Sequence, residues 1–194
     1  MKKNTAPQSL PPGYRLIPVK TFYLEMRSNP ETEPIAMPEG CEVERWEKPE
    51  VKEYKKIFSA VGGEWGWSGR LILREKKLQK IIWAKTTENY RLRSSEQVAG
   101  FAELDRSVPG QVEIVYFGLI PAFIGCGLGR FFLDWTMRKA WEGDARRVWL
   151  HTCQFDHPGA LAVYRRAGFV VVDEKIETHP YSEEFIRKVD AVDN

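Results

Sequence analysis

The chain has few cysteines, and they are spaced too widely to form a recognisable framework. Three occur among 194 residues, at Cys41, Cys126 and Cys153. An odd number of cysteines at this spacing fits neither a set of disulfides nor a zinc site, so we expect no metal. A reducing cytoplasm is therefore the compartment that the cysteine pattern favours.

Long apolar runs and an excess of charge of one sign are also missing. No stretch approaches the 18 apolar residues of a membrane-spanning helix, and the first residues lack the apolar core of a signal peptide. The net charge of +2 offers no general case for binding nucleic acid or a membrane surface. A hydrophobic content of 43% with seven Trp allows a proper core, and the length suits one domain.

What the chain does contain is a glycine-rich turn between a strand pattern and an amphipathic helix pattern. The strand runs from Glu113 to Leu119, the turn holds Gly125, Gly127 and Gly129, and the helix covers about 128–142. The N–H groups of such a turn and the positive end of the helix bind a pyrophosphate, which glycines allow to approach the backbone. By itself the turn could also be an ordinary tight turn. It is no Walker loop, because no Lys-Ser or Lys-Thr pair follows, and its spacing is not that of a Rossmann loop.

The remaining patterns predict a mixed α/β sheet in which antiparallel strands come first and a strand–helix–strand crossover comes late. We expect strands at 21–26, 41–46, 90–93, 97–104, 112–119, 147–152 and 169–176, and helices at 49–60, 74–82, 128–142 and 158–168. Asp134 and Arg138 should lie on the wet face of the third helix. No final strand is evident after Pro180, so the extra strand at 21–26 or a partner subunit, as in a homodimer, would close that edge.

The order of these elements and two motifs resemble the GNAT acetyltransferases over about residues 41–177. The family's glycine pattern, Arg/Gln-x-x-Gly-x-Gly/Ala, is met at Gly127 and Gly129 but not at Ile124, which supplies no side-chain donor. The family's Tyr-x-x-x-Gly-Phe pattern is met by the run from Tyr164 to Phe169. The resemblance implies a mostly antiparallel central sheet with flanking helices and a splayed pair of fourth and fifth strands. Residues 1–40 would be a tail with an extra strand, and residues 178–194 a C-terminal extension.

The resemblance also implies acetyl-CoA as the cofactor, with its pantetheine arm lying between the splayed strands. A bulge at Gly118 would open them, unless this residue is a simple packing glycine. The residues that we expect at the cofactor are Phe117, Leu119, Ile124, Gly125, Gly127, Leu128, Gly129, Arg130, His157 and Tyr164. His157 precedes Pro158 and could instead cap the helix that follows.

Acetyl transfer to an amine needs a proton acceptor, a polarised carbonyl and a proton for the leaving thiolate. Glu113 is the expected general base, because it lies 11 residues before Ile124, like the catalytic Glu of the family's histone acetyltransferases. A chain of bound water is the alternative. Tyr164 is the expected general acid, or else a core aromatic whose hydroxyl is tied to backbone. The N–H of Leu119 would hold the oxyanion.

The resemblance implies an acceptor pocket between the first two helices, where two Trp residues lie. Trp65 and Trp67 would form its wall, with Glu64 and Arg70 setting its polarity, although core packing is an alternative for the indoles. The resemblance therefore implies an acetyl-CoA-dependent N-acetyltransferase that acts on a primary amine of a small molecule or peptide. Transfer of a longer acyl group, and a non-catalytic acyl-CoA sensor, remain open.

Overall fold

The computed structural model describes residues 10–191, so the first nine residues of the predicted N-terminal tail and the last three of the predicted C-terminal extension lie outside the described residues. The helices and strands follow in the order β1 (Tyr14–Met26), β2 (Cys41–Arg45), α1 (Val51–Gly62), α2 (Glu75–Ile82), β3 (Thr87–Ser94), β4 (Gln97–Val108), β5 (Gln111–Leu119), α3 (Leu128–Trp141), β6 (Arg147–Cys153), α4 (Ala160–Arg166), β7 (Val170–Ser182) and α5 (Glu183–Asp190). Short 3-10 turns lie at Gly63–Trp65 and Pro121–Phe123. The mixed α/β fold predicted from the sequence is confirmed.

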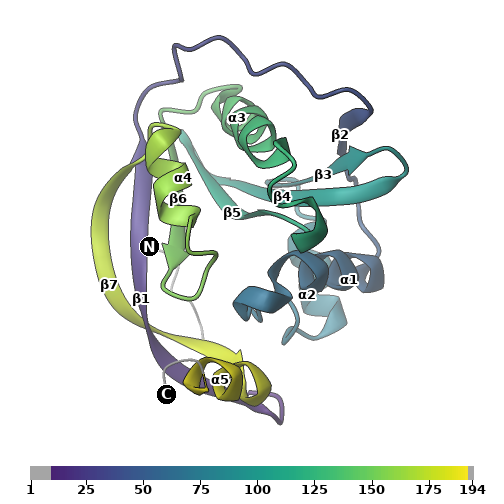
Figure 1. Ribbon diagram of the computed structural model, residues 1–194, viewed down its shortest axis with the longest axis vertical. Coiled ribbons are helices and arrows are strands. Elements are labelled where there is room, and N and C mark those ends of the chain that lie inside the picture. Colours follow the sequence, from purple (N-terminus) through teal and green to yellow (C-terminus); the bar gives the residue numbers. More distant parts are fainter. Residues whose placement is uncertain (1–9, 192–194) are drawn as a thin grey trace.

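One seven-stranded sheet has the order β2-β3-β4-β5-β6-β1-β7. Every neighbouring pair is antiparallel except β5 and β6, which are parallel because α3 carries the chain across between them. Figure 1 shows the sheet opening between β5 and β6, with helices on both sides of the opening.

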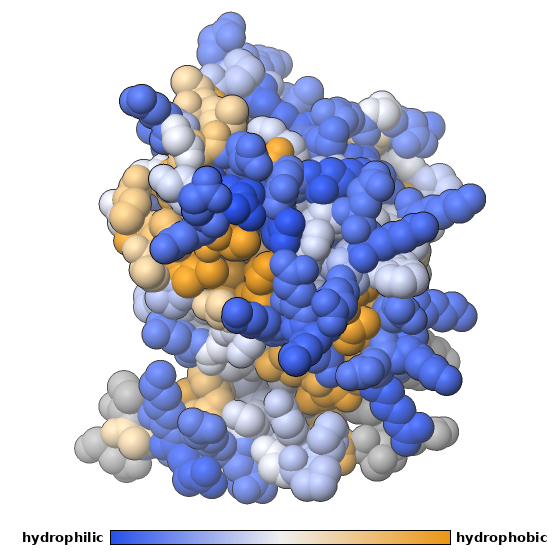
Figure 2. Space-filling view, turned by 90° about the vertical axis from the view of Figure 1, so that its right-hand side faces the viewer, coloured by the Kyte–Doolittle hydropathy of each residue, from blue (hydrophilic) through white to orange (hydrophobic). Residues whose placement is uncertain are grey.

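The two faces of the sheet bury separate apolar clusters. Helices α3 and α4 pack on one face against a core that includes Leu24, Leu150 and Phe132. Helices α1 and α2 pack on the other face, where Tyr54, Phe58 and other apolar residues of α1 recur at helical spacing. The side of the molecule that lies at the right of Figure 1 is mostly hydrophilic, with apolar patches between hydrophilic side chains (Figure 2). None of the helices in the described range is long and apolar enough to cross a membrane.

The parallel strands β5 and β6 pair only at their beginnings. Their register runs from Gln111 opposite Arg147 to Ile114 opposite Leu150, and beyond these residues the strands part. The bulge lies at Val115, because Ile114 and Tyr116 face successive residues of β4. The prediction of a bulge at Gly118 was therefore wrong by three residues.

Gly118 is instead a packing glycine, which was the alternative to a bulge in the sequence analysis. A Cβ atom built on it would stand 2.7 Å from Cγ1 of Val61 in α1. Because real Cβ contacts are not that short, only glycine lets α1 approach β5 this closely. This approach places the end of α1, and the residues that follow it, beside the opening in the sheet.

The edge beyond β6 is built differently from what the sequence predicted. β1 extends over 13 residues and lies inside the sheet, paired with β6 on one side and with β7 on the other. The predicted extra strand therefore joins β6 to β7 and leaves β7 as the edge. The final helix α5 was not predicted; Ser182 caps its start, because its hydroxyl accepts a hydrogen bond from the Phe185 N–H.

The loop between β1 and β2 covers part of α3. Asp134 accepts hydrogen bonds from the Ile35 N–H and from Arg138, and Arg138 also donates to the Thr32 carbonyl. Asp134 is buried, so the prediction that this pair lies on a wet face was wrong. The loop between β1 and β2 instead crosses over α3, as seen at the top of Figure 1.

The close approach at Gly118 gives a stability prediction. Gly118→Ala should destabilise the fold by about 1–3 kcal/mol, because the added methyl overpacks against the buried, β-branched Val61. Gly129→Ala is the matched control, since its Cβ would make an ordinary 3.5 Å contact in a helix, where Ala is favoured. Urea unfolding midpoints measure both. Equal midpoints for Gly118→Ala and the wild-type protein would contradict the packing role.

Candidate functional site

A cavity of about 1220 Å³ runs through the opening between β5 and β6. Ile114 and Leu150, where the strands part, are among the residues that line it. Side chains from α3 and α4 line it on one face of the sheet, and residues that follow α1 line it on the other. The cavity therefore connects the two faces, and a long, thin ligand could pass from one to the other.

The glycine loop lies where β5 leads into α3. Gly125 and Gly127 adopt φ angles of +86° and +81°, which glycine tolerates at no steric cost. A Cβ atom at either residue would meet no other heavy atom within 4 Å, so the loop backbone borders open space. No side chain caps the first turn of α3, whose N–H groups are thus left for a ligand.

The predicted cofactor residues differ in what they present to the cavity. Those that line it are Phe117, Leu119, Ile124, Gly129, Arg130, His157 and Tyr164. The side chain of Leu128 is buried in the core with α3, so only its backbone is available to a ligand. His157 accepts a hydrogen bond at Nδ1 from the Gly159 N–H, so it also organises the turn before α4.

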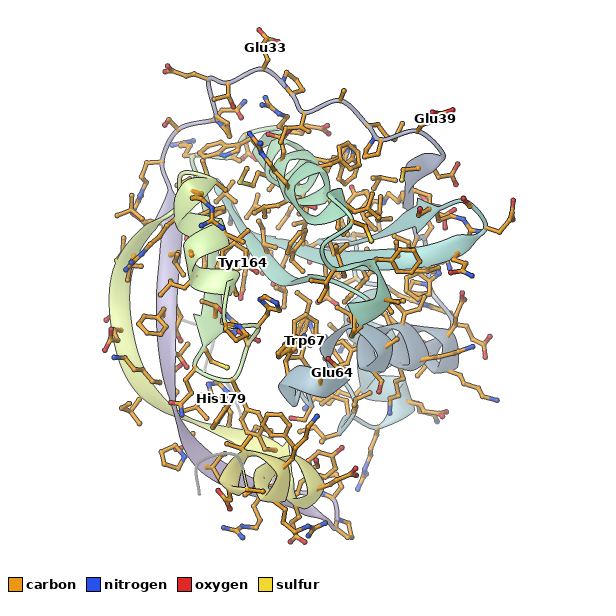
Figure 3. All side chains as sticks on the ribbon, viewed as in Figure 1. Glu33, Glu39, Glu64, Trp67, Tyr164 and His179 are labelled. Atoms are coloured by element: carbon orange, nitrogen blue, oxygen red, sulfur yellow. The ribbon has the colours of Figure 1, made fainter. Side chains whose placement is uncertain are left out.

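Tyr164 of α4 lies beside the opening, across from Trp67 (Figure 3). Its ring makes edge contacts with Phe117 and Phe169. Within residues 10–191 its hydroxyl makes no hydrogen bond, so it is not tied to backbone. Burial, and then the negative charge of Asp156, raise the pKa of this phenol well above its ordinary value. Tyr164 therefore keeps its proton at neutral pH.

Trp65 and Trp67 line the same cavity from the segment after α1. The Trp65 ring meets the His157 ring edge to face at 5.1 Å between centroids. The Trp67 Nε1–H donates to Asp156 Oδ1 at 2.9 Å, and the indole packs on Phe58. Both indoles thus form a wall that is anchored on one side by α1 and on the other by the turn after β6.

The C-terminal helix α5 helps to hold that wall, a contribution that the sequence analysis missed. The Ser68 hydroxyl donates to the carbonyl of Pro180 in β7. The ring of Phe185 lies so close to Gly66 that a Cβ there would stand 2.7 Å from it. The amphipathic pattern of residues 183–190 was the available signal, with the capping Ser182 before it.

Arg70 and Glu64, predicted to set the polarity of the acceptor pocket, do not line the cavity among the described residues. Arg70 forms a buried ion pair with Glu103, which also accepts a hydrogen bond from the Tyr54 hydroxyl. Burial alone would lower the pKa of Arg70, but the Glu103 carboxylate outweighs it and raises the pKa. Glu64 is exposed and lies near Trp67 at the surface (Figure 3).

Glu113, the predicted general base, is separated from the cavity by a histidine. Its Oε1 lies 3.6 Å from Nδ1 of His151 on β6, and His151, rather than Glu113, is among the residues that line the cavity. Desolvation alone would lower the pKa of His151. The carboxylate of Glu113, with Asp156 and Glu177, outweighs desolvation and raises this pKa above its ordinary value.

Comparison with known proteins identifies the fold independently. A family model described as acetyltransferase (GNAT) family matches residues 54–169. Among solved structures, a GCN5-related N-acetyltransferase from Sphaerobacter thermophilus aligns with a TM-score of 0.63 at 17% identity, over 88% of this chain and 53% of that one. A putative GNAT acetyltransferase from Novosphingobium aromaticivorans aligns with a TM-score of 0.58 at 19% identity, over 92% and 71%.

A smaller relative shows the same architecture. An aminoglycoside acetyltransferase from an uncultured soil metagenomic sample, in complex with trehalose, aligns with a TM-score of 0.58 at 13% identity, over 72% of this chain and 95% of that one. A comparison with curated proteins gives no match. This chain spans about half the length of the Sphaerobacter protein. At these identities the solved structures establish the fold.

The buried ion pair beside the Trp wall gives the second prediction. Glu103→Ala should destabilise the protein by about 3–5 kcal/mol, because it leaves the Arg70 charge buried without its partner. Glu142→Ala, which breaks an exposed pair with Lys139, should cost no more than about 1 kcal/mol. Chemical denaturation compares them. A double variant, Arg70→Met with Glu103→Leu, should recover much of the loss; if Glu103→Ala behaves like the exposed control, the pair is not structural.

Proposed function

The chain belongs to the GNAT acetyltransferase family, and on that premise we propose that it transfers an acetyl group from acetyl-CoA to a primary amine of a small molecule or peptide. One observation carries the proposal. A single cavity joins an uncapped helix N-terminus with a glycine loop on one side of the sheet to an aromatic pocket on the other. A ligand with an anionic end and a reactive far end fits this arrangement.

The glycine loop and the first turn of α3 would hold the pyrophosphate. Backbone N–H groups do this work, because Ile124 supplies no polar side chain there. Arg130, which is exposed at the cavity mouth, adds a positive charge on the same side, and Arg166 of α4 lines the cavity as well. These groups fit the phosphates of coenzyme A.

The parted strands would hold the pantetheine arm. Beyond Ile114, the edge of β5 that faces β6 has no strand partner in the described chain. Its backbone groups can therefore pair with the amides of an extended ligand, as a peptide pairs with a sheet edge. Phe117 and Leu119 line this stretch, and the Leu119 N–H is our candidate for the oxyanion donor.

Tyr164 would protonate the leaving thiolate. Its hydroxyl stays protonated at neutral pH for the reasons given above and lines the cavity beside Phe117. The thioester supplies an activated acetyl group, and the Trp65–Trp67 wall would hold the body of the amine. Aromatic faces attract a cationic amine by about 0.5–2 kcal/mol. The aminoglycoside-acetylating neighbour makes small polyamines reasonable probes.

Cofactor binding is tested at Gly129. Gly129→Trp should abolish stabilisation by coenzyme A, because the indole fills space at the helix N-terminus where the pyrophosphate would lie. In the wild-type protein, ligand at 100 times its Kd should add about 2.7 kcal/mol of stability, measured as a thermal shift. Glu142→Trp, at the opposite end of the same helix, should keep the full shift. The absence of any shift in the wild-type protein would refute the cofactor assignment.

The role of Tyr164 is tested by deletion of its hydroxyl. Tyr164→Phe should lower kcat by about 10²-fold or more, the usual effect of losing a general acid, and leave the thermal shift with coenzyme A unchanged. Thiol release from acetyl-CoA with spermidine, tyramine, kanamycin and a short peptide measures the rate. Tyr14→Phe at the start of β1 is the control. An unaltered kcat with the best of these amines removes Tyr164 from the mechanism.

A further inference from the structure

The amine must lose a proton before it can attack, and we infer that Nε2 of His151 takes this proton while Glu113, behind the ring, positions it. This inference rests on the proposed function and names the proton acceptor within the same site. His151 has no place in the family's motifs quoted above. His151 lines the cavity because β5 and β6 part just before it, at Ile114 and Leu150.

The geometry places the imidazole between the carboxylate and the cavity. Ile114 and Leu150 are opposite each other and face the α3 side, so their neighbours Glu113 and His151 face the other side, where Trp67 lies. His151 Nδ1 points to Glu113, which leaves Nε2 as the nitrogen available to a ligand. The side chain is 37% exposed and lines the cavity.

The titratable groups around His151 come from four parts of the chain. They are Glu113 on β5, Tyr23 on β1, Asp156 after β6, and Glu177 and His179 on β7. The three carboxylates favour a proton on His151. His179, in contrast, has a lowered pKa, because it is desolvated and lies near His151. Of the two histidines, His151 is therefore the stronger base.

The other carboxylates near the cavity are already engaged. Asp156 accepts hydrogen bonds from the Trp67 Nε1–H, the Thr152 hydroxyl and the Cys153 N–H. Glu177 accepts a hydrogen bond from the Tyr23 hydroxyl at 2.6 Å. Neither is as free as His151 to receive a proton from a ligand. Among the described residues at this end of the cavity, Nε2 of His151 is the best-placed acceptor.

The ammonium form of the amine gives one proton to Nε2 of neutral His151, whose Nδ1 lies 3.6 Å from Glu113 Oε1. The freed lone pair attacks the thioester carbonyl carbon, the C–N bond forms, and the C–S bond then breaks. Tyr164 protonates the departing thiolate and regains a proton from the nitrogen of the new amide. His151 finally releases its proton to water, so one proton is produced per acetyl group transferred.

Glu113 acts through His151 and not on the amine. Its negative charge stabilises the imidazolium that forms, and the contact with Nδ1 keeps the proton on that nitrogen, so that Nε2 remains basic. Because a base works only when it is deprotonated, kcat/KM should fall as the pH drops through the pKa of His151. Loss of Glu113 lowers this pKa and should move the fall to lower pH.

A titration that needs no acceptor tests the pair first. The chain has only three histidines, so their ring C–H signals can be assigned by substitution and followed by NMR against pH. His151 should titrate above the ordinary value of about 6.5 in the wild-type protein and lower in Glu113→Gln. Glu174→Gln, a change at an exposed residue of the edge strand, should leave it unmoved. An unshifted His151 in Glu113→Gln overturns the pairing.

Kinetics then separate three outcomes, with the best amine of the panel above as the probe. His151→Gln should lower kcat/KM by about 10²-fold or more and remove the acidic limb, whereas Glu113→Gln should keep the limb at lower pH. If the limb instead survives in His151→Gln and disappears in Glu113→Gln, Glu113 is the base and the inference fails. If it survives in both, the inference also fails, because the limb belongs to the amine or to another group.

Chemical rescue distinguishes a base from a structural residue. In His151→Ala, which removes a half-exposed ring and should melt near the wild-type temperature, added imidazole should restore part of the rate. A variant that is slow only because its pocket has deformed would not respond. If the wild-type protein itself acetylates none of the amines, the proposed function fails together with this inference. Turnover without rescue overturns the inference alone.

Discussion

The parting of β5 and β6 after four paired residues is the constraint on which the rest of the molecule depends. A sheet that opens in its middle leaves backbone groups without partners, and it must hold its two halves together by other means. The apolar cluster on the α3 face does this, because it contains residues of β1 and β6 as well as of β4 and β5, and α3 packs across both halves. The chain leaves β5 through the glycine loop, so the positive end of α3 necessarily lies at the mouth of the opening.

At the end of the cavity that Trp65 and Trp67 line, contacts of side chains hold the walls in place more than pairing between strands does. The indole of Trp67 is bonded to Asp156, which also ties the turn after β6, so one carboxylate fixes both walls. Arg70 and Glu103 form a buried pair beside it, and the Ser68 hydroxyl reaches β7. Because buried polar contacts are costly to leave unmade, these bonds favour one arrangement of the pocket. The histidine that we propose as base lies inside this framework.

The sequence predicted the layered fold, the glycine loop before α3 and the helix that carries Tyr164, because these features leave local patterns. Alternation marks strands, glycines mark the loop before α3, and the Tyr164 motif marks α4. The position of β1 inside the sheet left no local signal, since its partners lie far along the chain. The same is true of Arg70, whose partner Glu103 is 33 residues away, and of His151, which meets Glu113 only through strand register. Gly118 was misread because a bulge and a packing contact favour the same residue.

The central position of β1 has a consequence for synthesis of the chain. Thr21 of β1 pairs with Cys153, and its other neighbour β7 comes later still, so its partners do not yet exist when β1 leaves the ribosome. At about 5–20 residues per second, the delay is on the order of ten seconds. During that time both edges of a 13-residue strand are open to other chains. Prolines at positions 11, 12 and 18 fall in or beside this strand, and they cannot donate to a ladder, which makes the waiting strand a poorer template for aggregation.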